Sequence, residues 1–307
     1  MNLKNYLPVL AGLTFSSIFG FTFMFTKEGL EAIGPFHLLG FRFGLASIVL
    51  SILVLTGIIK VNFKGKKLGV LFLLATCQPG FYFIFETLGV NMTTSSEAGL
   101  MISLIPVVVT ILAALFLDEK PNRKQLFFIL LSVAGVFFIV LMKGTTDVQS
   151  NYLGLLVIFG AVFMGGVYNI LSRSLSLSFK PVEITFVMIW YGTILFNIIG
   201  FIRVGGPISS YLAPLTEINV LIPVIYLGLF ASVIAFFTMN YTLSKIQASQ
   251  SAVFANFTTV VSILAGVLIR NEPFYWFQIV GAIMIILGVW GTNYYGELEQ
   301  PVEEIPG

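Results

Sequence analysis

The sequence is short of charged residues. Of its 307 residues, 10% are Asp, Glu, Lys or Arg and 57% are hydrophobic, whereas a soluble globular domain has about 25% charged residues. So few charges cannot cover the surface of a soluble protein of this length, and the mean hydropathy is +0.98. The composition therefore predicts an integral membrane protein whose outer surface is mostly in contact with lipid.

Cysteine and histidine are nearly absent. Cys77 and His37 are the single residues of their kinds, which argues against a disulfide framework, a Cys-rich metal site and a centre built on two histidines. The sequence also lacks paired acids suited to metal-dependent chemistry, a Ser/His dyad and a Gly-rich phosphate loop with its Lys. We therefore expect no enzyme, no metal and no cofactor. A nucleic-acid partner is not expected either, because the chain has no basic stripe or tail.

Long apolar runs fill most of the chain. A membrane-spanning helix needs about 20 mostly apolar residues, and ten stretches meet this requirement. The runs are continuously apolar and not alternating, which favours helices over a β-barrel. The predicted fold is an all-α integral membrane protein with ten transmembrane helices. The predicted spans are Tyr6–Thr26, Pro35–Ile58, Leu68–Val90, Thr94–Leu117, Lys124–Met142, Tyr152–Ser172, Pro181–Val204, Val220–Tyr241, Ala248–Ile269 and Pro273–Asn293.

The basic residues are distributed unevenly between the two sides of this arrangement. Ten spans place both termini on one side, which holds eleven of the 16 Lys and Arg residues; four lie on the other side, and Arg42 lies inside a predicted span. Because cytoplasmic loops carry the basic excess, we expect a multi-pass protein of the cell membrane with both termini in the cytoplasm. The eleven are Lys4, Lys60, Lys64, Lys66, Lys67, Lys120, Arg123, Lys124, Arg173, Lys180 and Lys245.

The two halves of the chain repeat each other. An offset of 153 residues pairs Glu119 with Glu272, and an offset of 146 pairs Lys27 with Arg173. The two offsets differ by an insertion of seven residues, which we place around Gly205–Ile218. Further pairs occur in the same order at the same two offsets, and this indicates an internal duplication.

Each repeat contains five predicted helices, so the second enters the membrane from the opposite face. Inverted repeats are a recurring architecture of secondary transporters, because one fold in two orientations gives inward-open and outward-open states of similar energy. The predicted organisation is a five-helix repeat over residues 1–146, an inverted five-helix repeat over 147–295 and a disordered cytoplasmic tail over 296–307.

The first half contains several short motifs, and the second half repeats this pattern less closely. In the first half they are Phe19-Gly20, Arg42-Phe43, Glu86-Thr87-Leu88-Gly89, Thr94–Leu100, Ile105-Pro106, Leu117-Asp118-Glu119 and Ala134-Gly135-Val136. In the second half they are Asn240–Leu243, Ala248-Ser249, Asn271-Glu272-Pro273 and Leu287-Gly288-Val289. The sequence resembles the drug/metabolite transporter superfamily, specifically its EamA-type ten-helix carriers. One departure is that Pro106 has no proline counterpart in the ninth span, where Thr258 and Thr259 stand, so a bend of that span is left open.

The resemblance implies a secondary transporter that exports small amphipathic metabolites, such as amino acids, by alternating access. It also allows a multidrug carrier or a carrier of lipid-linked or nucleotide sugars. From the residues alone, a passive channel or a non-transporting membrane protein stays open as a different class. The expected partners are a small-molecule substrate and the lipid bilayer. Protons are a candidate coupling ion, since no ATP-binding motif is present, and a homodimer is one open assembly state.

The candidate site residues are polar side chains within the predicted spans. Glu86 is foremost, because a charged group at membrane depth usually faces a cavity or a partner. It is a candidate for binding a substrate amine or a coupling proton, and the alternative is a structural bond, for example to Arg42. The resemblance implies that the first, third, fourth, sixth, eighth and ninth helices line a central cavity. The predicted substrate-binding residues are Ser17, Tyr82, Glu86, Ser96, Tyr168, Asn169, Asn240 and Asn256.

Other features have a structural alternative. Arg42 suits a carboxylate, or it ties two helices together. Gln78-Pro79-Gly80 and Pro106 predict kinks. Lys27 and Arg173 suit the ends of helices and also the two mouths of a carrier, as gates. For Glu119 we expect a capping or loop role.

Overall fold

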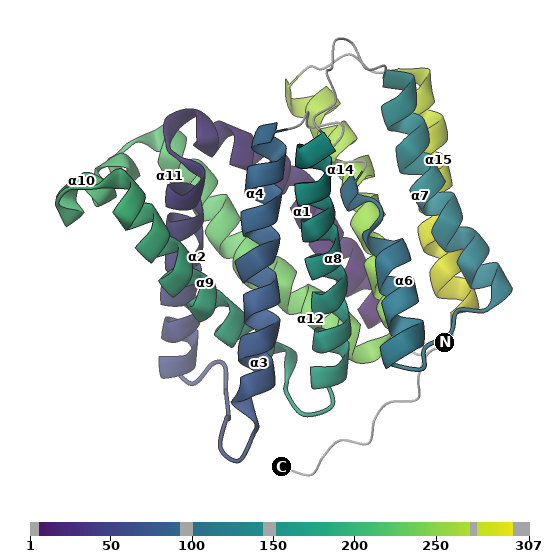
Figure 1. Ribbon diagram of the computed structural model, residues 1–307, viewed down its shortest axis with the longest axis horizontal. Coiled ribbons are helices and arrows are strands. Elements are labelled where there is room, and N and C mark those ends of the chain that lie inside the picture. The colour runs from purple at the N-terminus through teal and green to yellow at the C-terminus, as the bar shows by residue number, and fades with distance from the viewer. Residues whose placement is uncertain (1–5, 93–100, 144–151, 271–274, 297–307) are drawn as a thin grey trace.

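The protein is a bundle of helices. The computed structural model describes residues 6–92, 101–143, 152–270 and 275–296, and every regular element in these ranges is a helix (Figure 1). In chain order they are α1 (Leu7–Ala32), α2 (Pro35–Leu55), α3 (Leu68–Ala75), η2 (Thr76–Phe81), α4 (Tyr82–Met92), α6 (Ile105–Phe116), α7 (Arg123–Lys143), α8 (Tyr152–Leu175), α9 (Pro181–Val204), α10 (Ile208–Leu212), η3 (Ala213–Thr216), α11 (Ile218–Ile225), η4 (Tyr226–Ala235), α12 (Phe236–Lys245), α13 (Ala248–Ala252), α14 (Phe254–Arg270) and α15 (Trp276–Tyr295).

Eight helical stretches within the described ranges are long and apolar enough to cross a membrane. Each overlaps a predicted span, and the largest difference is in the first, which continues to Ala32 and does not end at Thr26. The prediction of an all-helical, multi-pass membrane protein is therefore confirmed. The predicted span Thr94–Leu117 contains the shorter apolar helix α6, and its first residues lie outside the described ranges. The predicted span Lys124–Met142 corresponds to α7, which has 21 residues.

Several helices are interrupted within the membrane. Gln78 has an extended backbone (φ −147°, ψ 120°) inside η2 and divides α3 from α4, as the Gln-Pro-Gly motif predicted. Pro106 lies in the first turn of α6, where the missing N–H of proline does no harm. The sequence did not predict η4, a π-helical stretch that follows Pro223 of α11. α13 and α14 are separated by a turn at Val253, so the ninth span is interrupted without a proline.

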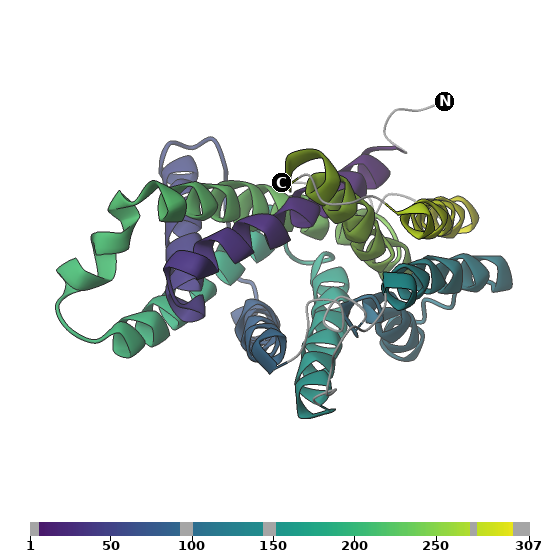
Figure 2. The ribbon, with the colours of Figure 1, turned by 90° about the horizontal axis from the view of Figure 1, so that it is seen from above.

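The helices pack as two pairs and two groups. α7 and α15 lie side by side in both views (Figures 1 and 2), and α2 packs along α9. In group A, α8 packs against α3, α4 and α6; in group B, α1 packs against α11, η4, α12 and α14. The first helix of each predicted half therefore lies among helices of the other half.

One end of the bundle, which we call the basic end, gathers many helix termini. Short contacts join four pairs of segments at this end: the start of α1 with the end of α12, the segment after α6 with the end of α8, the start of α7 with the end of α15, and the α2–α3 connection with α9. These contacts are Thr242 Oγ1 to Pro8 O (3.3 Å), Arg173 Nε to Glu119 Oε1 (2.8 Å), Asn122 Nδ2 to Tyr295 O (2.7 Å) and Lys66 Nζ to Glu183 Oε2 (2.6 Å). Ten of the eleven basic residues that the sequence assigned to one side belong to this end; Lys4 lies outside the described ranges.

The predicted insertion forms α10 and η3 at the opposite end, where α10 projects from the bundle (Figure 1). Tyr211 of α10 stacks on His37, whose Nε2 bonds the Tyr211 carbonyl at 2.8 Å. The Tyr211 hydroxyl donates to Asn197 Oδ1 at 3.0 Å. Burial raises the pKa of Tyr211 to about 12, so this phenol keeps its proton and remains a donor at neutral pH.

Candidate functional site

Glu86 and Tyr82 lie one turn apart on α4, directly after the break in η2. Residues four apart share one face of a helix, and the Tyr82 hydroxyl donates to Glu86 Oε1 at 3.3 Å. Both side chains are half-buried. The Tyr82 ring lies against Gly165 of α8, where an added Cβ would be 3.3 Å from the ring. The predicted carboxylate thus lies inside group A, with a phenol as its hydrogen-bond partner.

Arg42 of α2 is buried close to this pair. Its Nε donates to Ser232 Oγ of η4 at 2.7 Å, and its guanidinium carbon lies 5.0 Å from the Phe83 ring centroid. Arg42 and Glu86 interact electrostatically, yet the described residues include no direct ion pair between them. The contact with Ser232 uses one of the five N–H donors of an arginine. An acid and a base are therefore held near each other without neutralising each other directly.

Tyr168 and Asn240 belong to a closed hydrogen-bond network between α8, α9 and α12. Asn240 Oδ1 accepts from the Tyr168 hydroxyl at 2.9 Å and from Ser172 Oγ at 2.6 Å. Its Nδ2 donates to Thr185 Oγ1 at 3.1 Å. All four side chains are fully buried. The structure brings these two predicted site residues together, with their polar atoms already paired.

Three further predicted site residues lie on three different helices, α8, α14 and α1. Asn169 donates to the Gly165 carbonyl at 2.8 Å on its own helix, and Asn256 donates to Ser132 Oγ of α7 at 3.1 Å. The amide oxygens of both asparagines are buried without a hydrogen-bond partner among the described residues. Ser17 of α1 is half-buried. Ser96, also predicted, lies outside the described residues.

Comparison with known proteins decides the family. The model of the EamA-like transporter family matches residues 7–141 and 152–294. The chain belongs to the EamA-like transporter family. It is 34% identical over 286 residues to the "Uncharacterized transporter YcxC" of Bacillus subtilis (strain 168), covering 92% of each chain. It is 24% identical over 291 residues to an "Uncharacterized transporter" of Archaeoglobus fulgidus, covering 94% of this chain and 98% of the other.

A solved crystal structure shows the same fold. It superposes with a TM-score of 0.76 at 17% sequence identity, covering 93% of this chain and 97% of the other. The resemblance predicted from the motifs is thus confirmed, and this EamA-family protein is a multi-pass membrane transporter. Its relatives are named as transporters and not as enzymes.

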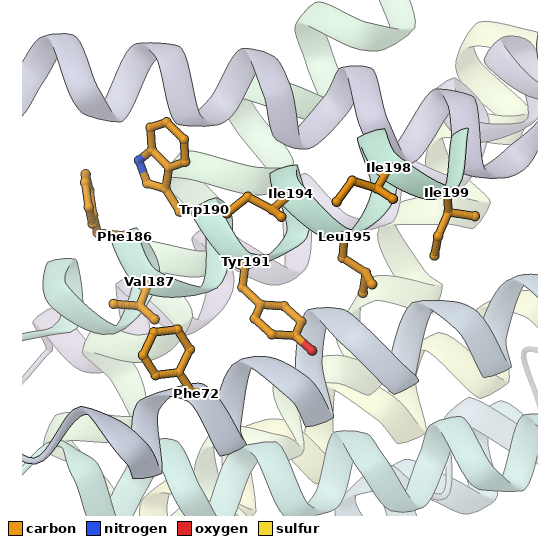
Figure 3. A pocket seen from close by; sticks show the side chains of 9 residues that line it. All are labelled: Phe72, Phe186, Val187, Trp190, Tyr191, Ile194, Leu195, Ile198 and Ile199. Atoms are coloured by element: carbon orange, nitrogen blue, oxygen red, sulfur yellow. The ribbon is translucent and has the colours of Figure 1, made fainter. Parts of the chain in front are cut away.

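A groove on the outside of this transporter holds none of the predicted site residues. It has a volume of about 430 Å³ and lies between α3 and α9 (Figure 3). Trp190, Ile194 and Ile198 are among its lining side chains and are exposed on the surface that faces lipid. Its lining residues, within the part of the chain that the structure describes, include no charged one. We therefore assign the candidate site to the Glu86, Tyr82 and Arg42 cluster and not to this groove.

The sequence missed several polar partners of the site residues. Ser232, Ser172 and Thr185 were not predicted as functional, yet each bonds a site candidate. Serine and threonine are common between membrane helices, so their residue types carry no signal of their own. The one available signal was that each lies in an apolar stretch of a predicted span.

Proposed function

We propose that this transporter is a secondary carrier that exports small amphipathic metabolites, amino acids foremost, across the cytoplasmic membrane. In this proposal the chain has ten spans, arranged as two inverted five-helix repeats over residues 1–146 and 147–295. The carrier works by alternating access, with both termini in the cytoplasm. The observation that carries the proposal is the exchange of first helices between the halves, which groups α8 with α4 and α6, and α1 with η4, α12 and α14.

This exchange has the pattern that a two-fold axis in the membrane plane would give. The predicted repeat makes α1 equivalent to α8, and it makes α4 and α6 equivalent to the α11–α12 and α13–α14 spans. Each group then consists of the first helix of one half and the third and fourth helices of the other. The family model also matches two stretches, 7–141 and 152–294. Two equivalent groups that rock against each other would open opposite faces alternately.

Contacts between α7 and α15 support the same symmetry. An added Cβ on Gly135 would lie 2.8 Å from the Gly281 carbonyl oxygen, and one on Gly288 would lie 2.8 Å from the Phe128 carbonyl oxygen. The offset of 153 residues converts Gly135 into Gly288 and Phe128 into Gly281. The two contacts are thus exchanged by the proposed repeat. Small residues at such crossings let membrane helices approach closely.

The charge distribution supports the orientation. Ten described basic residues belong to the basic end, whereas Lys27, Lys143, Arg203 and Arg270 belong to the opposite end. Basic excess marks the cytoplasmic side. We therefore assign the basic end to the cytoplasm.

The candidate site suits a zwitterion. Glu86 offers a carboxylate for an ammonium group, and Arg42 offers N–H donors for a carboxylate. Because these residues make no direct ion pair, an amino acid could bind with one charged group at each. A polyanion such as a nucleotide sugar would meet Glu86 unfavourably. The fully paired Tyr168 and Asn240 would then contribute through the shape of group A and its contact with α12.

The test is a flux screen in liposomes that contain the purified protein. Radiolabelled amino acids and several cationic drugs are offered with and without an imposed proton gradient, and protein-free liposomes provide the background. We expect uptake of at least one amino acid above background. Uptake of cationic drugs alone would favour the multidrug alternative, and flux of neither class would overturn the proposed substrate.

A further inference from the structure

We infer that the Glu119–Arg173 ion pair closes the cytoplasmic mouth by forming hydrogen bonds to the connection between α12 and α13. We call the ion pair together with these two hydrogen bonds the clasp. The inference rests on the alternating access proposed above and adds the residues that hold one mouth shut. Glu119 follows α6 and Arg173 lies in the last turn of α8, so both belong to group A. Their partners beyond the pair belong to group B.

The pair is short and buried. Arg173 Nε donates to Glu119 Oε1 at 2.8 Å, and both side chains are more than nine-tenths buried. Two opposite charges that are removed from water stabilise each other, because burying an unpaired charge costs several kcal/mol of free energy. The pair therefore forms one unit carried by the adjoining ends of α6 and α8, which pack directly on each other.

Both residues of this pair also make hydrogen bonds to group B. Glu119 Oε2 accepts the backbone N–H of Ala248 at 2.6 Å, and Arg173 Nη1 donates to the Leu243 carbonyl at 3.2 Å. Leu243 lies in the last turn of α12, and Ala248 is the first residue of α13. Both are fully buried. The carboxylate thus has the capping role expected for Glu119, but it caps a helix of the other half.

These two bonds cross between the groups where the mouth must part. If groups A and B rock apart at the basic end, the ends of α6 and α8 must separate from the α12–α13 connection. The ion pair can stay intact on group A, while the bonds to Ala248 and Leu243 break and water replaces group B. Hydrogen bonds to charged groups are stronger than neutral ones, so these two bonds add a charged contact to the neutral network of Tyr168, Ser172 and Asn240 that also joins α8 to α12.

The role of the hydrogen bonds to group B can be tested separately from the ion pair by one substitution that removes a backbone N–H. Ala248→Pro removes the N–H that donates to Glu119 and keeps both charged residues, and because the proline Cδ takes the place of that hydrogen, the Glu119 carboxylate must move away from this position. Proline is tolerated at the first position of a helix, and Gln247 already has the extended conformation required before proline (φ −55°, ψ 150°). Ala248→Ser keeps the N–H and serves as one control. Ile218→Pro, at the first position of α11 beyond Glu217 (φ −89°, ψ 131°), is a matched control at the other end.

Two reporter cysteines, one at the basic end and one near the middle of α1, measure access from the two faces in a Cys77→Ala background. Ser172→Cys replaces a fully buried hydroxyl between α8 and α12, and Ser17→Cys replaces a half-buried hydroxyl on α1. Right-side-out and inside-out vesicles are treated with a charged, membrane-impermeant thiosulfonate. Ala248→Pro should speed labelling of Ser172→Cys from the basic end by at least about tenfold, the scale of losing one hydrogen bond to a charged group. It should also slow labelling of Ser17→Cys from the opposite face, and both controls should match the parent.

The outcomes separate the clasp from the proposed function. If Ser172→Cys labelling rises while Ser17→Cys labelling is unchanged, the clasp stands and alternating access is contradicted. If Ala248→Pro leaves Ser172→Cys labelling unchanged, or speeds labelling from both faces together with a fall in melting temperature, the clasp is overturned. If Ala248→Pro does not fold, Glu119→Gln takes its place, because it keeps the side-chain shape and removes the charge. Glu119→Gln must then speed labelling of Ser172→Cys from the basic end alone; otherwise the clasp is rejected.

Discussion

The hydroxyl of Tyr82 donates a hydrogen bond of 3.3 Å to Oε1 of Glu86, one helical turn further along α4. This bond orients an acidic side chain inside a membrane helix, and the buried Arg42 lies within electrostatic range of it. A carboxylate in such a place is energetically costly. The three residues therefore form the part of the molecule where substrate chemistry is most readily tested.

Glu86→Gln should weaken amino-acid binding and leave folding nearly intact. The amide keeps the shape of the side chain and can still accept from Tyr82, but it no longer attracts an ammonium group. Loss of a charge-assisted bond should cost about 1–3 kcal/mol of binding free energy, measured as the dissociation constant of the amino acid identified in the flux screen. Glu28→Gln, at an exposed position of α1, is the matched control. Normal binding and transport by Glu86→Gln would remove Glu86 from the site.

Coupling to protons would give Glu86→Gln a different phenotype. A side chain that must release a proton in each cycle cannot be replaced by an amide, whereas exchange of substrate for substrate needs no net proton movement. If Glu86 couples protons, the variant should lose gradient-driven accumulation and retain exchange. Accumulation with unchanged pH dependence would contradict a coupling role.

Asn240→Ala should lower stability more than it lowers substrate affinity. The substitution leaves the hydroxyls of Tyr168 and Ser172 without their acceptor in a fully buried place. Leaving buried donors unpaired costs about 1–3 kcal/mol, which should appear as a lower melting temperature in detergent. Thr238→Ala on the same helix removes a partly exposed hydroxyl that bonds its own backbone and should change little. An Asn240→Ala protein with a parental melting temperature and weakened binding would place Asn240 in direct contact with substrate.

Gly288→Ala should separate α7 from α15. Its added methyl group would lie 2.5 Å from Ser132 Cβ and 2.7 Å from the Ser132 backbone nitrogen, so the helices must shift. The melting temperature should fall, because small-to-large changes in a packed interior typically cost about 1–3 kcal/mol. Gly69→Ala on α3 is the control, since an added Cβ there meets no atom within 4 Å. Equal melting temperatures for the two variants would show that this crossing is not tightly packed.

Single cysteines should label from opposite faces of the membrane. In a Cys77→Ala background, Lys64→Cys lies in the α2–α3 connection at the basic end, and Ile208→Cys lies on α10 at the other end. An impermeant reagent applied to intact cells should label Ile208→Cys and spare Lys64→Cys until the membrane is permeabilised. The reverse pattern would invert the orientation, and equal labelling would contradict the assigned topology.

The sequence predicted the helices well because lipid imposes strong rules on length and polarity. Pro35 and Pro181 begin helices where expected, and the Gln78–Gly80 motif marks a real break. Polar partners were harder to predict, because a buried polar residue looks the same whether it faces a cavity or another side chain. Asn240 was grouped with Glu86 because both are polar residues on helices that the resemblance implies line a cavity, although the hydrogen bonds of Asn240 are already made within the protein.

Contacts between segments that are distant in the chain could not be predicted from the sequence, for a different reason. Glu119 and Arg173 are 54 residues apart, and each was interpreted by its own helix end. Only the packing of α6 on α8 brings them together. The π-helical stretch η4 likewise has no signal beyond Pro223, because its backbone pattern depends on the surrounding helices.

Counterflow in proteoliposomes tests most directly whether this protein is a carrier. Vesicles are loaded with an unlabelled amino acid from the flux screen and diluted into a trace of the same labelled amino acid. A carrier that exposes one site to each face alternately should accumulate label transiently above its equilibrium level, because returning sites are occupied by unlabelled substrate inside. We expect this overshoot, with no overshoot in vesicles lacking the protein. Label that enters and simply equilibrates, with no overshoot at any internal concentration, would identify a passive pore and contradict the proposed alternating access.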